Sequence, residues 1–446
     1  MRKNMALFLI LVGVFTASLA YSFYYQLEPS TDALAYDRIA WNLACGFGYI
    51  ELESNVENPL EDDAIIRVGP GYELFLAGIY RTFGHATPVV WILHAIFRVI
   101  STFFVYKTAL ALFKENRHRE RIAFLSALLF GFSPDLVLIN GMLMTETLLL
   151  LGLIVATYFS IRYVEEKKAM TAFWAGLSFG LTALVRPTVL LAAGIFFLAL
   201  LARRSYRHAA LFIIIPVIVV GGWSARNSLL YEKPLFTTTA GSYDLWVGNH
   251  PDATGGFDKT REIQEARDSM HSTKLSSLAL KNYFRFLAEH PIQFTELQFR
   301  KTAIYFSLIR PTGFWSFLKD VPLEKALTLG ASGAWTLILF VFGGSGAAYL
   351  FLTRHDTLAR FFLVFALLQP LAVIPIIVET RYRYPLFPFL AVFGAFFMVK
   401  FFADASDRKT LRRIFWGTTL AFIAVTLYDV GLNSGELFSR VNEIIS

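Results

Sequence analysis

Apolar runs separated by short charged breaks recur along the whole chain of 446 residues. Several runs reach roughly 20 residues, the length that a helix needs to cross about 30 Å of hydrocarbon. We therefore predict about eleven membrane-spanning helices. They are expected at residues 5–25, 88–113, 121–140, 145–161, 171–186, 188–202, 209–224, 328–352, 359–378, 385–402 and 414–432. The pattern predicts an all-α polytopic membrane protein with a single domain over residues 1–446.

The charged breaks predict the orientation of the chain in the membrane. Lys and Arg gather in breaks that fall on one side when the spans alternate, at residues 114–121, 162–168, 203–208, 354–360 and 407–413. Because cytoplasmic loops carry an excess of these residues, that side and the N-terminus are expected to face the cytoplasm. Two large loops, residues 26–87 and 225–327, then face the external, periplasmic side. Residues 261–306 alternate charged and apolar residues at near-helical spacing, which predicts helices that lie at the membrane surface.

The composition agrees with a membrane chain and excludes several other classes. Apolar residues make up 55% of the sequence and charged residues only 17%, below the charged share of soluble domains. The formal charge of +7 does not indicate a nucleic-acid partner, because the basic residues form no continuous stripe. Cys45 is the single cysteine, so an intramolecular disulfide is excluded. The basic tip and Ser18-Leu19-Ala20 would suit a cleavable signal peptide, but the spans that follow favour an uncleaved anchor.

The stretch EPSTDALAYDRIAWNLACGFGY, residues 28–49, places two aspartates and several aromatic rings soon after the first span. Asp32 and Tyr36 are four residues apart and share one face of the predicted helix, whereas Asp37 points elsewhere. Asp32 is therefore a candidate functional carboxylate, with Tyr36 beside it. A helix cap formed by Thr31 or Asp32 would look the same in the sequence. Gly46-Phe47-Gly48 is expected to end the helix.

A second acidic candidate, Glu146, opens a predicted span in the sequence NGMLMTETLLLLGLI. Ionisable residues at a membrane edge that face a helix bundle are functional hypotheses. The alternative is a structural role, because a carboxylate at a helix N-terminus also interacts favourably with the helix dipole. Asp32 and Glu146 could share a divalent cation such as Mg²⁺ or Mn²⁺, although no paired histidine spacing supports a metal site.

Four arginines are expected on the external side: Arg67 in the first loop, and Arg186, Arg381 and Arg383 at the ends of spans. Cations on this side run against the positive-inside trend, which favours a role in binding an anion such as phosphate. Arg67 precedes the turn Gly69-Pro70-Gly71 and a short surface helix, where it could equally snorkel to the interface. For Arg381 and Arg383, an ion pair with Glu379 is the alternative.

Aromatic and amide side chains of the two predicted loops are candidates for binding a sugar or an acceptor. These are Tyr36, Tyr72, Tyr243, Trp246 and Asn249. Amphipathic rings and amides often line pockets for polar ligands. A packed loop with no ligand would carry the same residue types.

These motifs together resemble the polyprenyl-phosphate-sugar-dependent glycosyltransferases of the GT-C superfamily, in particular the protein O-mannosyltransferase and aminoarabinose-transferase-like group. The resemblance rests on the order of TDALAYDRIAWNLACGFGY, GPGYELFLAGIYRTFG, the acidic turn at Glu146, ALVRP, NSLLYEKPL and RYRYPLFPFL. It covers nearly the whole chain and is strongest over residues 28–190. It implies a many-span helical fold with an active site on the external face, beneath loops at the membrane surface.

The resemblance also implies an activity and roles for the candidate residues. The donor would be a sugar on a polyprenyl phosphate, and the acceptor an envelope lipid, polysaccharide or protein. Asp32 matches the position of the catalytic acid in the first loop and is expected to act as general base, while Glu146 matches a second acidic position. Arg67 would meet the donor phosphate, assisted by Arg381 or Arg383.

Two alternatives stay open. This chain has Thr31-Asp32 where the protein O-mannosyltransferases carry an Asp-Glu pair, which puts a protein acceptor in doubt. The second alternative is a transporter or flippase of a lipid-linked anion, with the arginines as a phosphate track. Such a transporter would require ionisable residues near mid-bilayer and broken helices, whereas the predicted spans are mostly uninterrupted.

Overall fold

The computed structural model describes residues 2–52, 62, 64–67, 69–257, 259–310, 322–353, 356–403 and 407–445. Within these residues the chain forms helices and no strands. Parts of the two predicted loops, residues 53–61, 63, 68, 258 and 311–321, lie outside the described residues. The predicted all-α fold is confirmed for the part of the chain that is described.

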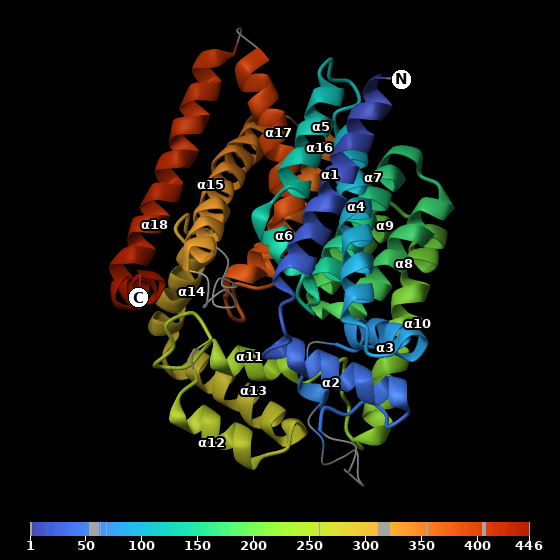
Figure 1. Ribbon diagram of the computed structural model, residues 1–446, viewed down its shortest axis with the longest axis vertical. Helices are drawn as coiled ribbons and strands as arrows, with labels where there is room; N and C mark the ends of the chain where they lie inside the picture. Colours follow the sequence, from blue (N-terminus) through green and yellow to red (C-terminus); the bar gives the residue numbers. More distant parts are fainter. Residues whose placement is uncertain are drawn as a thin grey trace.

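Long apolar helices form a bundle that occupies the upper two thirds of the molecule in Figure 1. They are α1 (Arg2–Tyr25), α4 (Thr87–Leu112), α5 (Arg119–Gly131), α6 (Pro134–Asn140), α7 (Glu146–Glu166), α8 (Ala169–Val185), α9 (Leu190–Ala202), α10 (Tyr206–Leu230), α15 (Pro322–Thr353), α16 (Thr357–Leu371), α17 (Phe387–Ala403) and α18 (Arg408–Ile445). Each predicted span coincides with one of these helices or, for residues 121–140, with α5 and α6 together.

The number of helices that can cross a membrane is lower than predicted when each must have at least 18 residues. Among the described residues, seven helices are long and apolar enough to cross, and the bent pair of α5 and α6 makes an eighth. The helices α8, α9 and α16 are apolar but shorter than 18 residues. The multi-pass membrane fold is therefore confirmed, whereas the count of about eleven spans is not.

The predicted span at residues 359–378 ends earlier than expected. Helix α16 ends at Leu371, and residues 372–379 form turns and an extended stretch. Pro375 has no N–H to donate to the carbonyl oxygen of Leu371, so the helix cannot continue through it. The chain then forms the short 3₁₀ helix η5 (Thr380–Leu386), which leads into α17.

Helix α17 lies at the centre of the bundle. Every residue from Phe387 to Phe397 is buried, as expected for a helix that is apolar on all sides. It packs against α5 and α15, which come from distant parts of the sequence. The rings of Phe113 and Phe396 stack with their centres 4.6 Å apart. The hydrophobic core therefore runs through the interior of the bundle.

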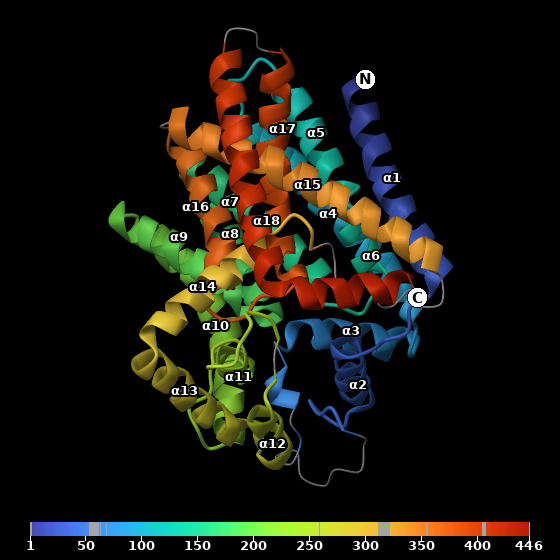
Figure 2. The ribbon, with the colours of Figure 1, turned by 90° about the vertical axis from the view of Figure 1, so that its left-hand side faces the viewer.

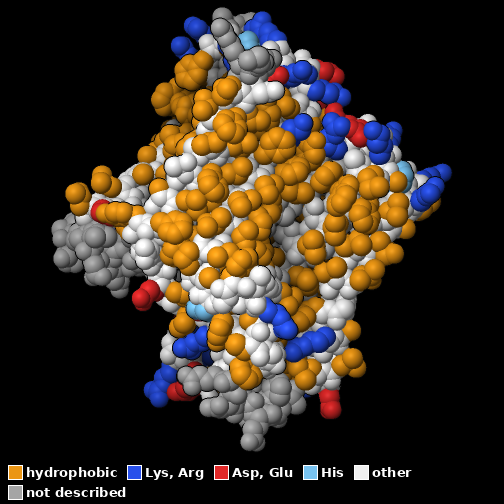
Figure 3. Space-filling model, turned by 45° about the vertical axis from the view of Figure 1, so that its right-hand side comes forward, with side chains coloured by type: hydrophobic (Ala, Val, Ile, Leu, Met, Phe, Trp, Pro, Cys, Tyr) orange, Lys and Arg blue, Asp and Glu red, His pale blue; other side chains and the backbone are white. Residues whose placement is uncertain are grey.

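The outside of the bundle is also hydrophobic. Figure 3 shows a broad band of hydrophobic side chains, with Lys, Arg, Asp and Glu gathered above and below it. In α1 and α18, which lie at the edge of the bundle, large side chains such as Phe8 and Leu427 are mostly exposed. Exposed apolar surface of this extent marks contact with a non-aqueous partner, here a lipid bilayer.

A layer of shorter helices lies across one end of the bundle (Figures 1 and 2). We call it the cap layer, and it consists of α2 (Asp32–Cys45), α3 (Gly71–Phe83), α11 (Ala240–Val247), α12 (Arg261–Ser269) and α13 (Ser272–Glu289). Helix α14 (Pro291–Phe306) leads from it back toward the bundle. The predicted short surface helix after Gly69 and the helices predicted within residues 261–306 are confirmed, and α2 ends before Gly46 as expected.

The bend between α5 and α6, 51°, is a packed feature of the bundle. Pro134 opens α6, so α5 cannot continue through it. The guanidinium of Arg98 in α4 donates to the carbonyl oxygen of Gly131 at 2.7 Å and to Ser18 Oγ at 2.6 Å. The end of α5 thus finds a hydrogen-bond donor inside the bundle.

We expect Gly176→Ala to destabilise the bundle. Gly176 lies where α8 crosses α10, and a Cβ atom there would collide with the carbonyl oxygen of Phe212. Overpacking of this kind costs about 1–3 kcal/mol, so the apparent melting temperature of the purified protein should fall by several degrees.

Gly194→Ala is the matched control, because Gly194 lies in the apolar helix α9 and a Cβ atom there meets no atom within 4 Å. The better helix propensity of Ala should stabilise this variant by up to about 1 kcal/mol. Equal melting temperatures for the two variants would contradict the close approach of α8 and α10.

Candidate active site

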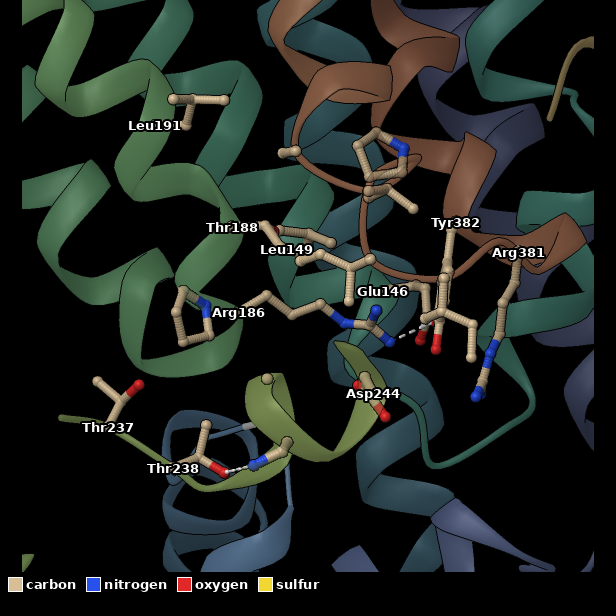
Figure 4. A pocket seen from close by; sticks show the side chains of 18 of the residues that line it. Glu146, Leu149, Arg186, Thr188, Leu191, Thr237, Thr238, Asp244, Arg381 and Tyr382 are labelled. Carbon is tan, nitrogen blue, oxygen red and sulfur yellow. Dashed lines mark hydrogen bonds and ion pairs between the residues drawn. The ribbon is translucent and has the colours of Figure 1, made fainter. Parts of the chain in front are cut away.

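Two cavities meet where the cap layer joins the bundle. The first, which we call the apolar cavity and which Figure 4 shows, has a volume of about 460 Å³ and mostly apolar walls that include Leu149, Leu191, Phe236, Val373, Ile376 and Ile377. The second, the polar cavity, has a volume of about 600 Å³ and walls that include Asp32, Tyr36, Arg67, Tyr243, Lys259 and Glu379. Several side chains line both cavities and form what we call the junction: Arg186, Asp244, Arg381 and Tyr382.

Asp32 stands at the first turn of α2 and lines the polar cavity. Its Oδ2 accepts a hydrogen bond from Arg381 Nη2 at 2.6 Å, and its Oδ1 lies 3.8 Å from Arg67 Nη1. Burial would raise the pKa of Asp32, but the charges of three arginines, Arg381 foremost, outweigh burial and lower this pKa below its ordinary value. The carboxylate is therefore ionised at neutral pH.

The faces of α2 are arranged as predicted. Tyr36 lines the polar cavity with Asp32. Asp37 instead accepts a hydrogen bond from the Tyr80 hydroxyl at 2.5 Å and lies 2.9 Å from His85 Nε2. Asp37 therefore joins α2 to α3 and takes no part in the cavity.

Arg67 reaches the polar cavity from the segment before α3. Its guanidinium forms a bidentate pair with Glu51, in which Nε donates to Oε2 at 2.8 Å. This segment lies close to the end of α8, because Gly69 packs against the carbonyl oxygen of Leu184 and has no room for a Cβ atom. The close approach brings the segment of Arg67 beside the chain that leads into Arg186.

Glu146 and Arg186 form a buried ion pair on the bundle side of the junction (Figure 4). Arg186 Nη2 donates to Glu146 Oε1 at 2.9 Å, and Arg186 Nε donates to Thr145 Oγ1 at 3.0 Å. Pro187 ends α8 and favours the extended backbone that Arg186 adopts. The structure thus brings two residues of the predicted site into direct contact.

Tyr382 lies beside both junction arginines. The guanidinium carbons of Arg186 and Arg381 lie 5.2 Å and 5.6 Å from the centre of its ring. An aromatic ring attracts cations and so stabilises two like charges near one another. Guanidinium groups bind carboxylates and phosphates through charge-assisted hydrogen bonds, so this arrangement suits an anion. The prediction from the sequence did not include Tyr382, for which the alternation RYRY was the available signal.

Asp244 of α11 is a junction residue that the sequence interpretation also missed. Its side chain is partly buried, and burial raises its pKa to about 7. The charge of Asp32 acts in the same direction, whereas Arg186 and Arg381 oppose the increase. Among the described residues, the carboxylate has no hydrogen-bond or ion-pair partner. Nothing in the sequence SYDLW distinguishes this aspartate from one in a solvated loop.

Arg383, a predicted phosphate ligand, lies outside both cavities. It is buried and donates to the backbone carbonyl oxygens of Ser307 at 2.8 Å and Thr380 at 3.3 Å, and to that of Arg310. In a 3₁₀ helix, residues two apart point in different directions, which separates Arg383 from Arg381. Arg383 therefore ties η5 to the segment after α14.

Three of the predicted sugar-binding or acceptor-binding residues also lie outside the two cavities: Tyr72, Trp246 and Asn249. The Tyr72 hydroxyl lies 3.3 Å from His94 Nε2 in the bundle. Trp246 packs in the core of the cap layer, and Asn249 bonds to backbone carbonyl oxygens. Of this set, Tyr36 and Tyr243 line the polar cavity.

The donor atoms at the junction do not favour a metal ion. Within the described residues, no group of three His, Cys, Asp or Glu side chains could hold one. Asp32 and Glu146, the two predicted ligands, are each paired with a guanidinium group. A shared Mg²⁺ or Mn²⁺ therefore stays a prediction without support from this geometry.

We expect Asp244→Asn to stabilise the protein at alkaline pH. The pKa of Asp244 is about 7 in the folded protein, compared with an ordinary value of 3.8. The unfolded chain therefore ionises first, and folding stability decreases as the pH rises toward 7. Asn does not ionise, so the variant should melt at a higher temperature than the parent at pH 8 and at a similar temperature near pH 4.

Asp268→Asn is the matched control, because Asp268 is exposed in α12 and lines neither cavity. It should melt like the parent at both pH values. If Asp244→Asn changes the melting temperature equally at pH 4 and pH 8, the buried environment assigned to Asp244 is wrong.

A comparison with solved structures finds three similar chains, each with a TM-score below 0.5. The Archaeoglobus fulgidus oligosaccharyltransferase in the apo form is 14% identical with a TM-score of 0.47, covering 96% of this chain and 56% of that chain. Its complex with zinc and sulfate is 16% identical with a TM-score of 0.44, covering 95% and 53%. ArnT from Cupriavidus metallidurans, bound to undecaprenyl phosphate, is 10% identical with a TM-score of 0.45, covering 99% and 73%. The chain thus spans about half the length of the oligosaccharyltransferase.

No curated protein matches the sequence. Residues 67–223 match the model of the dolichyl-phosphate-mannose-protein mannosyltransferase family. The matched part contains the short surface helix, Glu146 and Arg186, which belong to the motifs on which the predicted resemblance rests. Over residues 67–223, the match confirms the predicted resemblance to the protein O-mannosyltransferases.

Proposed function

We propose that the chain is a membrane glycosyltransferase that transfers a sugar from a polyprenyl-phosphate-linked donor to the hydroxyl of an envelope acceptor. The observation that carries this proposal is the junction, where Arg186 and Arg381 stand between an apolar and a polar cavity. A lipid-linked sugar has matching parts in the same order: an apolar chain for the apolar cavity, an anionic phosphate for the arginines and a polar sugar for the polar cavity. The match to a family named for a dolichyl-phosphate donor supports this assignment.

The apolar cavity suits the proximal part of the polyprenyl chain. Leu149 and Ile377 form part of its inner wall, whereas Leu191 and Phe236 are 41% and 60% exposed. The cavity is thus open toward the apolar outside of the bundle, so that a chain held in the membrane could enter it. The phosphate would then reach the guanidinium groups of the junction.

The chemistry is a displacement at the anomeric carbon of the donor sugar. The oxygen of the acceptor hydroxyl forms a bond to this carbon, the bond between the carbon and the phosphate oxygen breaks, and polyprenyl phosphate leaves. Asp32 takes the proton of the hydroxyl, a contribution of typically 10²- to 10⁴-fold to the rate. Arg186 and Arg381 stabilise the negative charge on the departing phosphate.

The ion pairs of the junction support these roles. Arg381 Nη2 lies 2.6 Å from Asp32 Oδ2. A phosphate that takes Arg381 as its partner releases one oxygen of Asp32 for the acceptor hydroxyl. Glu146 holds Arg186 at the junction through its own ion pair and so acts as a positioning residue in this proposal.

The orientation and the acceptor belong to the same proposal. The basic clusters at residues 114–121 and 203–208 support a cytoplasmic position for the end of the bundle opposite the cap layer. The cap layer and the junction would then lie on the external face, where an envelope lipid, polysaccharide or protein would supply the hydroxyl. Asp32 and Glu146 each form an ion pair with an arginine, so the proposed reaction assigns neither of them to a metal ion.

The bend between α5 and α6 does not favour the alternative of a transporter. Broken helices in transporters line the substrate site. Here Arg98 fills the break by donating to Gly131, and neither residue lines the two cavities of the junction. The ionisable residues that do line the cavities lie where the bundle meets the cap layer.

We expect Asp32→Asn to abolish sugar transfer in the cell. The gene would be disrupted and the envelope glycans compared by mass spectrometry, so that the missing sugar identifies both the sugar and its acceptor. Complementation with the parent should restore the sugar, whereas Asp32→Asn should reduce transfer by roughly 10²-fold or more, because the base is lost.

Asp37→Asn is the matched control, since Asp37 lies in the same helix and is bound to Tyr80 and His85. It should restore the sugar to within a few-fold of the parent level. The proposed function is wrong if disruption leaves every glycan unchanged, and the role of Asp32 is wrong if its folded Asn variant complements fully.

A further inference from the structure

Helix α11 crosses the junction and is fixed at both of its ends. At its start, Thr239 N donates to the carbonyl oxygen of Ile65 at 3.1 Å, and Thr238 Oγ1 donates to the same oxygen at 2.7 Å. Thr238 Oγ1 also bonds to the carbonyl oxygen of Arg67. The beginning of α11 is therefore tied to the segment that carries Arg67 into the polar cavity.

Asn249 and Lys301 fix the other end of α11. Asn249 Nδ2 donates to the carbonyl oxygen of Leu245 at 2.8 Å and to that of Ile376 at 3.0 Å. Lys301 Nζ, which is fully buried, donates to Asn249 Oδ1 at 2.7 Å and to Ile376 at 2.9 Å. The end of α11 is thus bound to the segment that leads directly into Arg381.

Asp244 lies in the middle of this fixed helix and faces the junction. Trp246 and Val247 of the same helix are buried in the core of the cap layer and line neither cavity, whereas Asp244 lines both. In Figure 4 Asp244 is drawn below the guanidinium of Arg186 and to the left of that of Arg381, with no dashed line to either. A partly buried carboxylate that lines both cavities and has no hydrogen-bond or ion-pair partner within the described residues is available to a ligand that enters them.

A lipid-linked donor carries its polyprenyl chain, phosphate and sugar in that order, and this order indicates where each group would lie in the two cavities and the junction. With the polyprenyl chain in the apolar cavity and the phosphate on Arg186 and Arg381, the sugar is the next group and enters the polar cavity. Asp244 lines both cavities and therefore stands beside this point of entry. It would repel the phosphate itself, because both are anionic, but it can accept hydrogen bonds from a sugar.

We infer that Asp244 binds the sugar of the donor by accepting hydrogen bonds from its hydroxyl or ammonium groups, and that it thereby helps to select the sugar. This inference rests on the proposed function. Burial raises the pKa of Asp244 to about 7, and hydrogen bonds donated by a sugar would favour its charged form.

The test compares ligands with and without a sugar. The ligands are undecaprenyl phosphate alone, undecaprenyl phosphate carrying mannose, and undecaprenyl phosphate carrying 4-amino-4-deoxyarabinose. Their binding at pH 8 is measured for the full-length parent and for the variants Asp244→Ala and Asp244→Asn. For a sugar-bearing ligand that the parent prefers over undecaprenyl phosphate, Asp244→Ala should weaken binding by roughly 10- to 100-fold, the loss of a hydrogen bond to a charged group. Binding of undecaprenyl phosphate should not weaken, because Asp244→Ala removes a negative charge that repels the phosphate. A preference for the amino sugar that is lost in the variant identifies an ammonium partner, and the same result with mannose identifies hydroxyl partners.

Asp268→Asn serves as the control and should bind all three ligands like the parent. If the variant loses affinity equally for the ligands with and without a sugar, the inference is wrong. Asp244 would then affect phosphate binding by Arg186 and Arg381 and not the sugar. Unchanged binding in both Asp244 variants would overturn it as well, while leaving the proposed function in place. If the parent binds none of the three ligands, the proposed function fails and the inference fails with it.

Discussion

Charge balance at the edge of the bundle is the constraint on which the site depends. Arg186 and Arg381 stand where an apolar bundle meets a polar layer, and an unpaired cation there would be costly. Each has a carboxylate within hydrogen-bond distance, Glu146 for Arg186 and Asp32 for Arg381. The second pair joins residues that are 349 positions apart, so it also binds the cap layer to the last third of the chain.

The backbone around the junction is shaped to hold these charges in place. Pro187 ends α8 directly after Arg186, and Pro375 keeps α16 from continuing into the segment before Arg381. Both arginines therefore lie just outside regular helices of the bundle. Hydrogen bonds from Asn249 and Lys301 then fix the irregular segment at Ile376. The backbone that carries the site is thus irregular in conformation but is fixed by several hydrogen bonds.

The fold was largely predictable from the sequence, and the site only partly. Apolar runs located every helix of the bundle, because length and hydrophobicity decide what can lie in hydrocarbon. Asp32, Glu146 and Arg186 were found because each is polar at the edge of an apolar run. Arg383 could not be separated from Arg381, since their directions depend on a 3₁₀ turn that leaves no pattern in the sequence. Asp244 was not predicted, because it lies in a polar segment, where an aspartate is expected to be solvated.

The pairing of Arg381 with Asp32 also determines which anions can enter. A carboxylate fixed on the same chain competes for the guanidinium at a high effective concentration, in the millimolar range or above for short tethers. A small anion that diffuses in from water, such as inorganic phosphate, competes poorly against it. A phosphate that is confined to the membrane beside the apolar cavity is itself locally concentrated. In the proposed function, the ion pair therefore favours ligands that arrive through the lipid.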